Sequence, residues 1–340
     1  MIKRVHDIKD DRRDALTLWI RQFPGLEDAT PTVASEDASF RRYFRVAAGQ
    51  SSWIVMDAPP PQEDCRPFAE IAGFLARAGL NSARVLEADF ERGFLLLSDL
   101  GSIQYLQALQ QHPENSADLY KDAMDALLQM QIAGSEFKDQ LPRYDQVLLR
   151  AELEIFRDWL CGHHLGIEFS TKDEQAWHAT CELLVDAALR QTQVAVHRDF
   201  HSRNLMVTPK DNPGVLDFQD MVCGPLTYDL VSLLKDCYIK STPEDIRINV
   251  EYFHRSSPDA SSDSTDNFVR DFDWMGTQRH LKAAGIFSRL LHRDGKEHYL
   301  QDIPRTLEYV SETTEIYSEF EFLGELLRDR VLPALHEASQ

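Results

Sequence analysis

The pattern of hydrophobic residues changes once along the chain, near residue 99, and this change limits the possible folds more than any other feature. Before it, the chain contains short apolar runs of strand length, and the turns between them hold Gly49 and Pro59–Pro61. The segment 66–79 differs, because its apolar residues recur every three or four positions, as in an amphipathic helix. We therefore expect a small antiparallel sheet with one main helix, with strands at 40–46, 52–56, 84–88 and 94–97.

The chain after residue 99 is dominated by long helical patterns. We place the boundary at Asp99–Gly101, which predicts an α+β architecture with two lobes. The N-terminal lobe would cover 1–98, and the larger, mostly helical C-terminal lobe would cover 99–340. A further short helix is expected at 11–23. The helices predicted in the C-terminal lobe are 116–133, 144–161, 173–190, 271–292 and 304–336.

Composition excludes several classes of protein. A length of 340 residues with 43% hydrophobic residues suits a folded chain with two lobes. The formal net charge of −20 would repel polyanions, so we expect no nucleic-acid partner. No apolar run is long enough to span a membrane, and the first residues lack the apolar core of a secretion signal. The five cysteines form no C-x-x-C pair, so we expect a reduced, cytoplasmic protein.

The most informative motif lies between Val194 and Asp220. His197-Arg198-Asp199 is followed five positions after the aspartate by Asn204, and Asp217 follows two short apolar runs separated by a Lys-Asp-Asn-Pro-Gly turn. This is the spacing of a kinase catalytic loop and its metal-binding aspartate. Asp199 would face the acceptor hydroxyl, while Asn204 and Asp217 offer the oxygen ligands that Mg²⁺ prefers. The alternative is a structural Asp/Asn hairpin.

This segment resembles the aminoglycoside phosphotransferase and choline-kinase-like superfamily. The resemblance continues through Gly224-Pro225 and Tyr228-Asp229-Leu230, where such enzymes begin a helix. It implies a bilobal, protein-kinase-like fold, with ATP and Mg²⁺ as cofactors and a structural role for Asp229. The chain lacks the A-P-E segment of protein kinases, which argues against a protein substrate.

The N-terminal lobe departs from this resemblance at the expected nucleotide site. It has no G-x-G-x-x-G, so backbone N–H groups of Ser39, Phe40 and Arg41 would have to cover the phosphates. Met56 occupies the place of the usual strand lysine. Either an arginine (Arg41, Arg42 or Arg45) replaces that charge, or the nucleotide is held more weakly.

Two further positions complete the nucleotide-site hypothesis. Leu97 and Asp99 end the last strand where the resemblance puts the hinge that packs on adenine. Glu70, on the helix at 66–79, would ordinarily pair with the missing lysine. Its negative charge is equally suited to the first turn of a helix.

A basic segment bears on the acceptor. Residues 278–296 contain five Lys or Arg and one Asp, a local charge of +4 in an acidic chain. The spacing of Arg279, Lys282, Arg289 and Arg293 puts them on one helix face. This face is either solvated, or Arg279 or a neighbour binds an anionic acceptor or the phosphates.

The runs YDQVLLRAELEIFRDWL and DWMGTQRHLKAAGIFSRLLHRDGK, together with VHRDFHSRNLMV, resemble bacterial kinases that act on the anomeric hydroxyl of N-acetylated amino sugars. This resemblance implies N-acetylmuramate and N-acetylglucosamine as acceptors, sugar 1-phosphates for peptidoglycan recycling as products, and no obligate protein partner. Glu152 and Glu154 are either exposed helix charges or bind sugar hydroxyls. His201 is either solvent-facing or contacts the substrate.

Three other functions stay open at this point. An aminoglycoside or choline-type kinase would use the same chemistry on a different acceptor. Met56 raises the possibility of a non-catalytic nucleotide-binding scaffold, although Asp199, Asn204 and Asp217 are all retained. A metal-dependent hydrolase would release free phosphate in place of a phosphorylated acceptor.

Overall fold

The computed structural model describes residues 10–36, 40–260 and 263–338. The chain divides into two compact units. The first, which we call the sheet unit, contains the residues up to Ser102 and the short segment Gly214–Gln219; the rest, from Ile103, forms the helical unit. Residues 99–102 and 214–219, which we expected in the C-terminal lobe, therefore lie in the sheet unit.

The sheet unit contains five antiparallel strands in the order β1-β2-β3-β5-β4. Four of them match predicted strands to within about two residues at each end. The first strand was not predicted, because its sequence TVASE lacks a regular alternation of apolar and polar residues. The strands are β1 (Thr32–Glu36), β2 (Arg42–Ala48), β3 (Ser51–Asp57), β4 (Val85–Asp89) and β5 (Phe94–Ser98).

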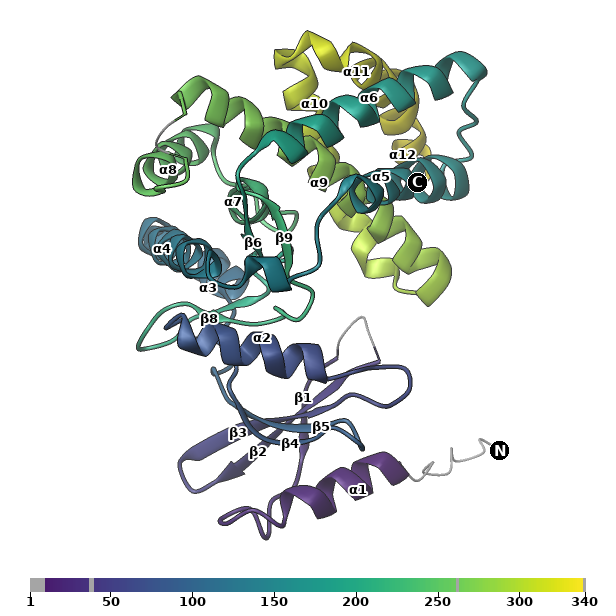
Figure 1. Ribbon diagram of the computed structural model, residues 1–340. Helices are drawn as coiled ribbons and strands as arrows, with labels where there is room; N and C mark the ends of the chain where they lie inside the picture. The colour runs from purple at the N-terminus through teal and green to yellow at the C-terminus, as the bar shows by residue number, and fades with distance from the viewer. Residues whose placement is uncertain (1–9, 37–39, 261–262, 339–340) are drawn as a thin grey trace, which may run out of the picture. The chain divides into compact units, whose positions relative to one another are not determined.

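Two helices cover opposite faces of this sheet (Figure 1). Helix α1 (Asp11–Ile20) buries Leu16, Trp19 and Ile20 against the face that carries Phe44 and Val55, among other apolar residues. Helix α2 (Arg66–Arg77) lies on the other face and buries Phe68, Ile71 and Leu75 at helical spacing. The strand alternation thus supplies apolar residues to both faces, as a sheet between two helices requires.

The helical unit is built mainly from α-helices, and two of its short strands, β6 and β9, pair antiparallel. The predicted helices at 116–133 and 173–190 are confirmed almost residue for residue, while α3 and α8 were not predicted. Its helices are α3 (Tyr105–Gln111), α4 (Ser116–Gly134), α5 (Gln146–Ile155), α6 (Thr171–Arg190), α7 (Tyr228–Leu234), α8 (Pro243–Ser256), α9 (Thr265–Asp294), α10 (Ile303–Ile316), α11 (Glu321–Leu326) and α12 (Leu332–Ala338). Its strands are β6 (Gln193–Val196), β7 (Leu205–Met206) and β9 (Val222–Pro225), and β8 (Gly214–Val215) belongs to the sheet unit.

Helix α9 is the centre of the helical unit. It is 30 residues long and packs against α5, α6, α7 and α10 (Figure 1). The Ser264 hydroxyl accepts a hydrogen bond from the Asn267 N–H at its start, and Gly295 with φ of 69° ends it. The middle of the helix is buried on all sides, polar residues included.

The predicted helix at 144–161 is instead two segments. Helix α5 is followed by a π-helical segment, η3 (Phe156–His164). The predicted apolar stripe on this segment was wrong, because Val147 is 76% exposed whereas Leu149 and Leu153 are buried. The buried face also contains Glu152, so counting apolar residues alone misplaced it.

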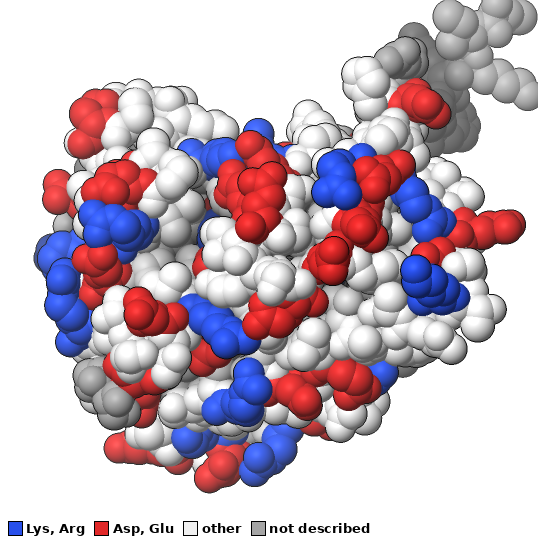
Figure 2. All heavy atoms as spheres, turned by 90° about the horizontal axis from the view of Figure 1, so that it is seen from above, with Lys and Arg blue, Asp and Glu red and all other residues white. Residues whose placement is uncertain are grey.

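The cysteines, the length of the helices and the surface charge bear on where such a chain can fold. All five cysteines are buried and unpaired. None of the helices in the described ranges is both long and apolar enough to cross a membrane. On the face shown in Figure 2, acidic and basic side chains alternate, so the negative charge is not gathered there into a single patch.

Candidate active site

The loop after β6 carries the predicted catalytic motif. The Asp229 carboxylate, at the start of α7, accepts hydrogen bonds from the backbone N–H groups of His197 (2.6 Å) and Arg198 (2.9 Å). Arg198 has φ of 77°, a left-handed conformation that residues with side chains rarely adopt. Burial raises the pKa of Asp229 to about 6. The two hydrogen bonds hold the strained turn that presents the next residue, Asp199.

Asp199 and Asn204 lie together in this loop. The backbone N–H of Asp199 donates to Nδ1 of His197 (3.2 Å), and its carbonyl oxygen accepts a hydrogen bond from Nδ2 of Asn204 (3.1 Å). The Asp199 side chain is only partly buried. The loop is therefore closed by its own hydrogen bonds while the carboxylate stays accessible.

The electrostatic surroundings keep Asp199 ionised. Burial by itself would raise the pKa of this carboxyl group, because a charge is poorly solvated inside a protein. The positive charges of Lys282 and Arg279 on α9 outweigh burial and hold the pKa below its usual value. Asp199 is thus a carboxylate at neutral pH, the form that accepts a hydrogen bond from a hydroxyl group.

Asp217 lies in the sheet unit, just after β8. Its φ is 60°, so it too has a left-handed backbone, and its Oδ1 accepts a hydrogen bond from Nε2 of Gln219 (2.7 Å). The next residue, Phe218, packs its ring on Phe68 of α2, with centroids 4.7 Å apart. Strained residues often occur at functional sites, which fits the predicted metal-binding role. That role stays a prediction.

Glu152 is a buried centre of polar contacts, so its interpretation as an exposed helix charge was wrong. It is 4% exposed. Its Oε1 lies 2.6 Å from Nη2 of Arg198 and 3.0 Å from Nζ of Lys282, and Oε2 accepts a hydrogen bond from Nε2 of Gln278 (3.3 Å). The Tyr144 hydroxyl also donates to it. Although burial opposes ionisation, Lys282 and Arg198 hold the pKa of Glu152 below its usual value.

The basic residues of α9 are not a solvated face. Arg279 is 5% exposed and Lys282 is 8% exposed. Lys282 is neutralised by Glu152 and contacts the Tyr228 hydroxyl (3.0 Å). Arg293, in contrast, is exposed and pairs with its neighbour Asp294. The interpretation of this helix as a uniformly solvated basic face is therefore wrong for its first two cations.

His201 is buried, at 8% exposure, so the expectation of a solvent-facing side chain was wrong. Its ring meets Tyr238 edge-on, at 5.2 Å between centroids. Burial lowers the pKa of His201 to about 4, so the imidazole is neutral at pH 7. Its Nδ1 has no hydrogen-bond partner within the described part of the chain.

The expected phosphate-covering loop is only partly visible, because Ser39 lies outside the described residues. Phe40 is 68% exposed, and its backbone N–H donates to the Glu63 carboxylate (3.2 Å). The Arg41 guanidinium lies 3.5 Å from the same carboxylate. Sequence reasoning missed Glu63, whose only signal is that it is an acidic residue in a proline-rich turn.

All three arginines proposed to replace the missing lysine have carboxylate partners, and that of Arg41 is Glu63. Met56 is fully buried in β3, opposite Tyr43 and Leu95. Arg42 donates to the buried carboxylate of Asp57 (3.1 Å).

The third of these arginines, Arg45, pairs with Asp99. The guanidinium of Arg45 donates to both oxygens of Asp99, at 2.7 and 3.0 Å. Burial opposes ionisation of Asp99, but Arg45 lowers its pKa.

Two other residues of the predicted nucleotide site differ in exposure. Leu97 is buried in β5, and Glu70 is exposed on α2.

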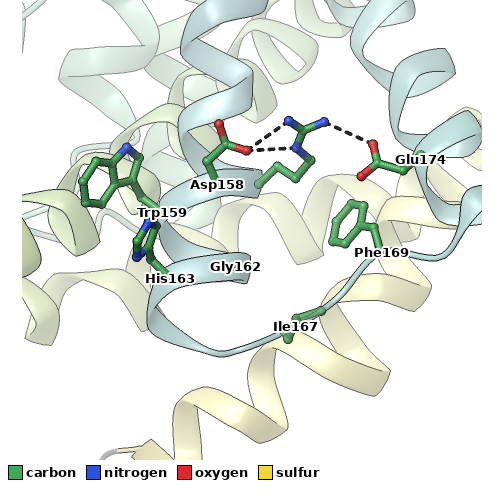
Figure 3. Close-up of a pocket in the computed structure, with 8 residues that line it drawn as sticks. Asp158, Trp159, Gly162, His163, Ile167, Phe169 and Glu174 are labelled. Atoms are coloured by element: carbon green, nitrogen blue, oxygen red, sulfur yellow. Dashed lines mark hydrogen bonds and ion pairs between the residues drawn. The ribbon is translucent and has the colours of Figure 1, made fainter.

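A separate cavity of about 640 Å³ lies beside η3 (Figure 3). Trp159 stacks on His163, and Arg157 is paired with Asp158 and Glu174. Because its arginine is fully paired and none of the predicted site residues lines it, this cavity is not the candidate active site. The described residues also contain no cluster of three His, Cys, Asp or Glu arranged to hold a metal ion.

Residues 30–264 match the model of the phosphotransferase enzyme family. The chain belongs to this family. It is 47% identical over 300 residues to the N-acetylmuramate/N-acetylglucosamine kinase of Pseudomonas aeruginosa, covering 86% of each chain. It is 39% identical to the protein of the same name from Neisseria meningitidis, covering 94% of this chain and 96% of that one.

Solved structures of the family share the fold at low identity. The GDP complex of an aminoglycoside 2'-phosphotransferase-IIIa matches with a TM-score of 0.61 and 15% identity, over 90% of this chain and 99% of that one. Choline kinase LicA from Streptococcus pneumoniae also matches with a TM-score of 0.61, at 11% identity, over 88% and 98% of the two chains. The predicted protein-kinase-like fold is confirmed, and the protein is a phosphotransferase of the kinase type.

Proposed function

We propose that this phosphotransferase transfers the γ-phosphoryl group of ATP to the anomeric hydroxyl of N-acetylmuramate and N-acetylglucosamine. The observation that carries the choice of acceptor is the name, N-acetylmuramate/N-acetylglucosamine kinase, shared by relatives that are 39–47% identical over most of the chain. The buried Glu152 carboxylate is already occupied by protein donors, so it would position the catalytic loop through Arg198 and leave the sugar hydroxyls to other groups.

Asp199 would orient the acceptor hydroxyl and receive its proton. The hydroxyl oxygen forms a bond to the γ-phosphorus while the bond from that phosphorus to the β–γ bridging oxygen breaks, and ADP leaves. Asp199 is a weak base because its pKa is lowered. An anomeric hydroxyl is more acidic than an ordinary alcohol, so a weak, well-placed base suffices.

Asn204 and Asp217 would hold Mg²⁺. Their side chains offer an amide and a carboxylate oxygen, and the ion would neutralise charge on the phosphates. A magnesium site of this kind completes its coordination with phosphate oxygens and water, so the protein need not supply a larger cluster. The strained backbone of Asp217 supports a functional role for this residue.

The product, a sugar 1-phosphate, would serve the reuse of peptidoglycan fragments. The reaction would take place in the cytoplasm, where ATP is available. The aminoglycoside phosphotransferase and the choline kinase compared above are only 15% and 11% identical to this chain, so they support the fold and not these acceptors.

A direct test combines the protein with MgATP and a panel of N-acetylated amino sugars, followed by phosphorus NMR. We expect a sugar 1-phosphate from N-acetylmuramate and N-acetylglucosamine. Turnover of kanamycin or choline with none of either sugar would refute the choice of acceptor. Free phosphate as the only product would indicate a hydrolase, and inactivity toward every acceptor would favour a scaffold.

A further inference from the structure

Arg279 differs from Arg198 and Lys282 in forming no direct ion pair with a carboxylate of the described residues, although Asp199 and Asp236 are near enough to act on its charge. Arg198 and Lys282 both contact Glu152. Within the described ranges, the guanidinium of Arg279 makes one hydrogen bond, from Nη1 to Sγ of Cys237 (3.6 Å), and its Nε has no hydrogen-bond partner. Burying an unpaired charge is costly, so an arginine at 5% exposure is expected to have an anion nearby.

The neighbours of Arg279 do not supply that anion in direct contact. Burial raises the pKa of the Cys237 thiol, so the nearest group stays neutral. The carboxylate of Asp236 accepts backbone hydrogen bonds from Ser202 (2.9 Å) and Tyr238 (2.8 Å). Asp199 is close enough for Arg279 to lower its pKa, but the two form no ion pair.

A second buried polar group without a partner lies in the same place. His201 is 8% exposed, its Nδ1 lacks a hydrogen-bond partner in the described structure, and it too is close enough to influence Asp199. A guanidinium and a neutral imidazole, both buried and both offering unused N–H groups or lone pairs, therefore lie beside the residue that would receive the acceptor.

We propose that Arg279, assisted by His201, binds a carboxylate of the acceptor, namely the lactyl carboxylate that N-acetylmuramate has and N-acetylglucosamine lacks. This inference rests on the proposed function. The lactyl group is attached to C3 of the same sugar ring whose C1 hydroxyl would lie at Asp199, so the carboxylate falls within reach of the residues around it. A guanidinium suits a carboxylate because it donates two parallel hydrogen bonds.

The test compares the two sugars in the wild type and in Arg279→Gln. Loss of a charge-assisted contact should raise KM for N-acetylmuramate about 10- to 100-fold and change KM for N-acetylglucosamine less than about threefold. Arg279→Lys should retain part of the preference, because it keeps the charge and loses the paired hydrogen bonds. Arg293→Gln removes an exposed charge from the same helix and should leave the ratio of the two KM values unchanged.

A measurement on the unaltered enzyme covers the case in which Arg279→Gln does not fold. The lactyl amide of N-acetylmuramate is neutral but nearly the same shape as the acid. Wild-type enzyme should bind the amide about 10- to 100-fold more weakly than the acid. Equal KM values for acid and amide would overturn the proposal.

Other outcomes also decide the matter. Equal loss of kcat on both sugars in Arg279→Gln would mean that this arginine contacts the transferred phosphoryl group, and the carboxylate assignment would be wrong. A selective loss in Arg289→Gln, with none in Arg279→Gln, would move the carboxylate site along α9. If wild-type enzyme phosphorylates neither sugar, the proposed function fails, which is distinct from turnover of both sugars without the predicted selectivity.

Discussion

The sheet unit and the helical unit neutralise their buried charges in different ways. In the sheet unit the buried ions are carboxylates, and arginines that reach solvent neutralise them. Asp57 is fully buried and accepts hydrogen bonds from Arg12 and Arg42, while Asp99 is bound by Arg45. Each of these anions has at least one cation in direct contact, so the charges balance within the fold.

In the helical unit, buried cations and buried carboxylates occur together near the catalytic loop: Arg279 and Lys282 lie there with Glu152 and Asp236. Arg198 and Lys282 share the single carboxylate of Glu152, and Arg279 has no carboxylate in contact within the described residues. A buried charge cannot rely on water, so a cation without a direct partner is stable only if a negative charge lies near it. The comparison teaches that the buried carboxylates of the sheet unit are paired in direct contact, whereas Arg279 in the helical unit is not, and the proposed carboxylate site rests on that difference.

The largest expected effect comes from Asp199, the carboxylate that these cations keep ionised. Asp199→Asn preserves the shape of the side chain but cannot accept a proton. We expect kcat to fall about 10²- to 10⁴-fold, the usual contribution of a general base, with little change in thermal stability. Sugar phosphate formation and thermal unfolding measure the two quantities. A variant that keeps more than about a tenth of wild-type kcat would mean that Asp199 is not the base.

Glu152 tests the balance of charge in the helical unit. Glu152→Gln should lower the free energy of unfolding by about 3–5 kcal/mol, because it leaves Arg198 and Lys282 buried without their carboxylate. Urea unfolding monitors the change. The matched control is Glu154→Gln on the same helix, where the ion pair with Arg157 is partly exposed and a loss below about 1 kcal/mol is expected. Equal losses in the two variants would remove the distinction between buried and exposed pairs.

Glu152 also shows where sequence reasoning reaches its limit. Elements with strong apolar periodicity, such as α2, α4 and α6, were predicted within a few residues, because their buried faces consist of apolar side chains. The buried face of α5 includes a carboxylate that only distant residues can neutralise. No local pattern reports that Arg198 and Lys282, 46 and 130 positions further on, lie against it.

The candidate site also contains features that the sequence predicts and features that it does not. The local geometry of the loop that carries Asp199 and Asn204 was predictable, because a fixed short spacing separates the two residues and one turn of chain brings them together; their catalytic and metal-binding roles stay predictions. Arg279 and His201 were recognised as residues of interest, but their burial and their lack of partners depend on how α9 packs. Spacing predicts local geometry, whereas burial of a charge is a property of the packed unit.

His201 gives a pH test of the same buried environment. Its pKa is lowered from 6.5 to about 4, so the unfolded chain binds a proton more readily than the folded one between these values. Above pH 6.5 the imidazole is neutral in both states, so it does not lower the free energy of unfolding. As the pH falls from 6.5 toward 4, protonation of the unfolded chain lowers the free energy of unfolding by roughly 3 kcal/mol. His201→Gln should therefore lose less stability than wild type between pH 7 and pH 4, as measured by urea unfolding. Parallel losses in the two proteins would mean that His201 is not buried in its neutral form.

The smallest effect is expected in the sheet unit, where Asp57 tests the other side of the comparison. Asp57→Asn leaves Arg12 and Arg42 partly exposed, so water compensates their charges, and we expect a loss of about 1–3 kcal/mol in the free energy of unfolding. Asp28→Asn removes the same charge from an exposed position of this unit and should change stability by less than about 0.5 kcal/mol. The contrast between the two units would not hold if Asp57→Asn lowered the free energy of unfolding as much as Glu152→Gln does. Solvent access of Arg12 and Arg42 would then not reduce the cost of removing their carboxylate.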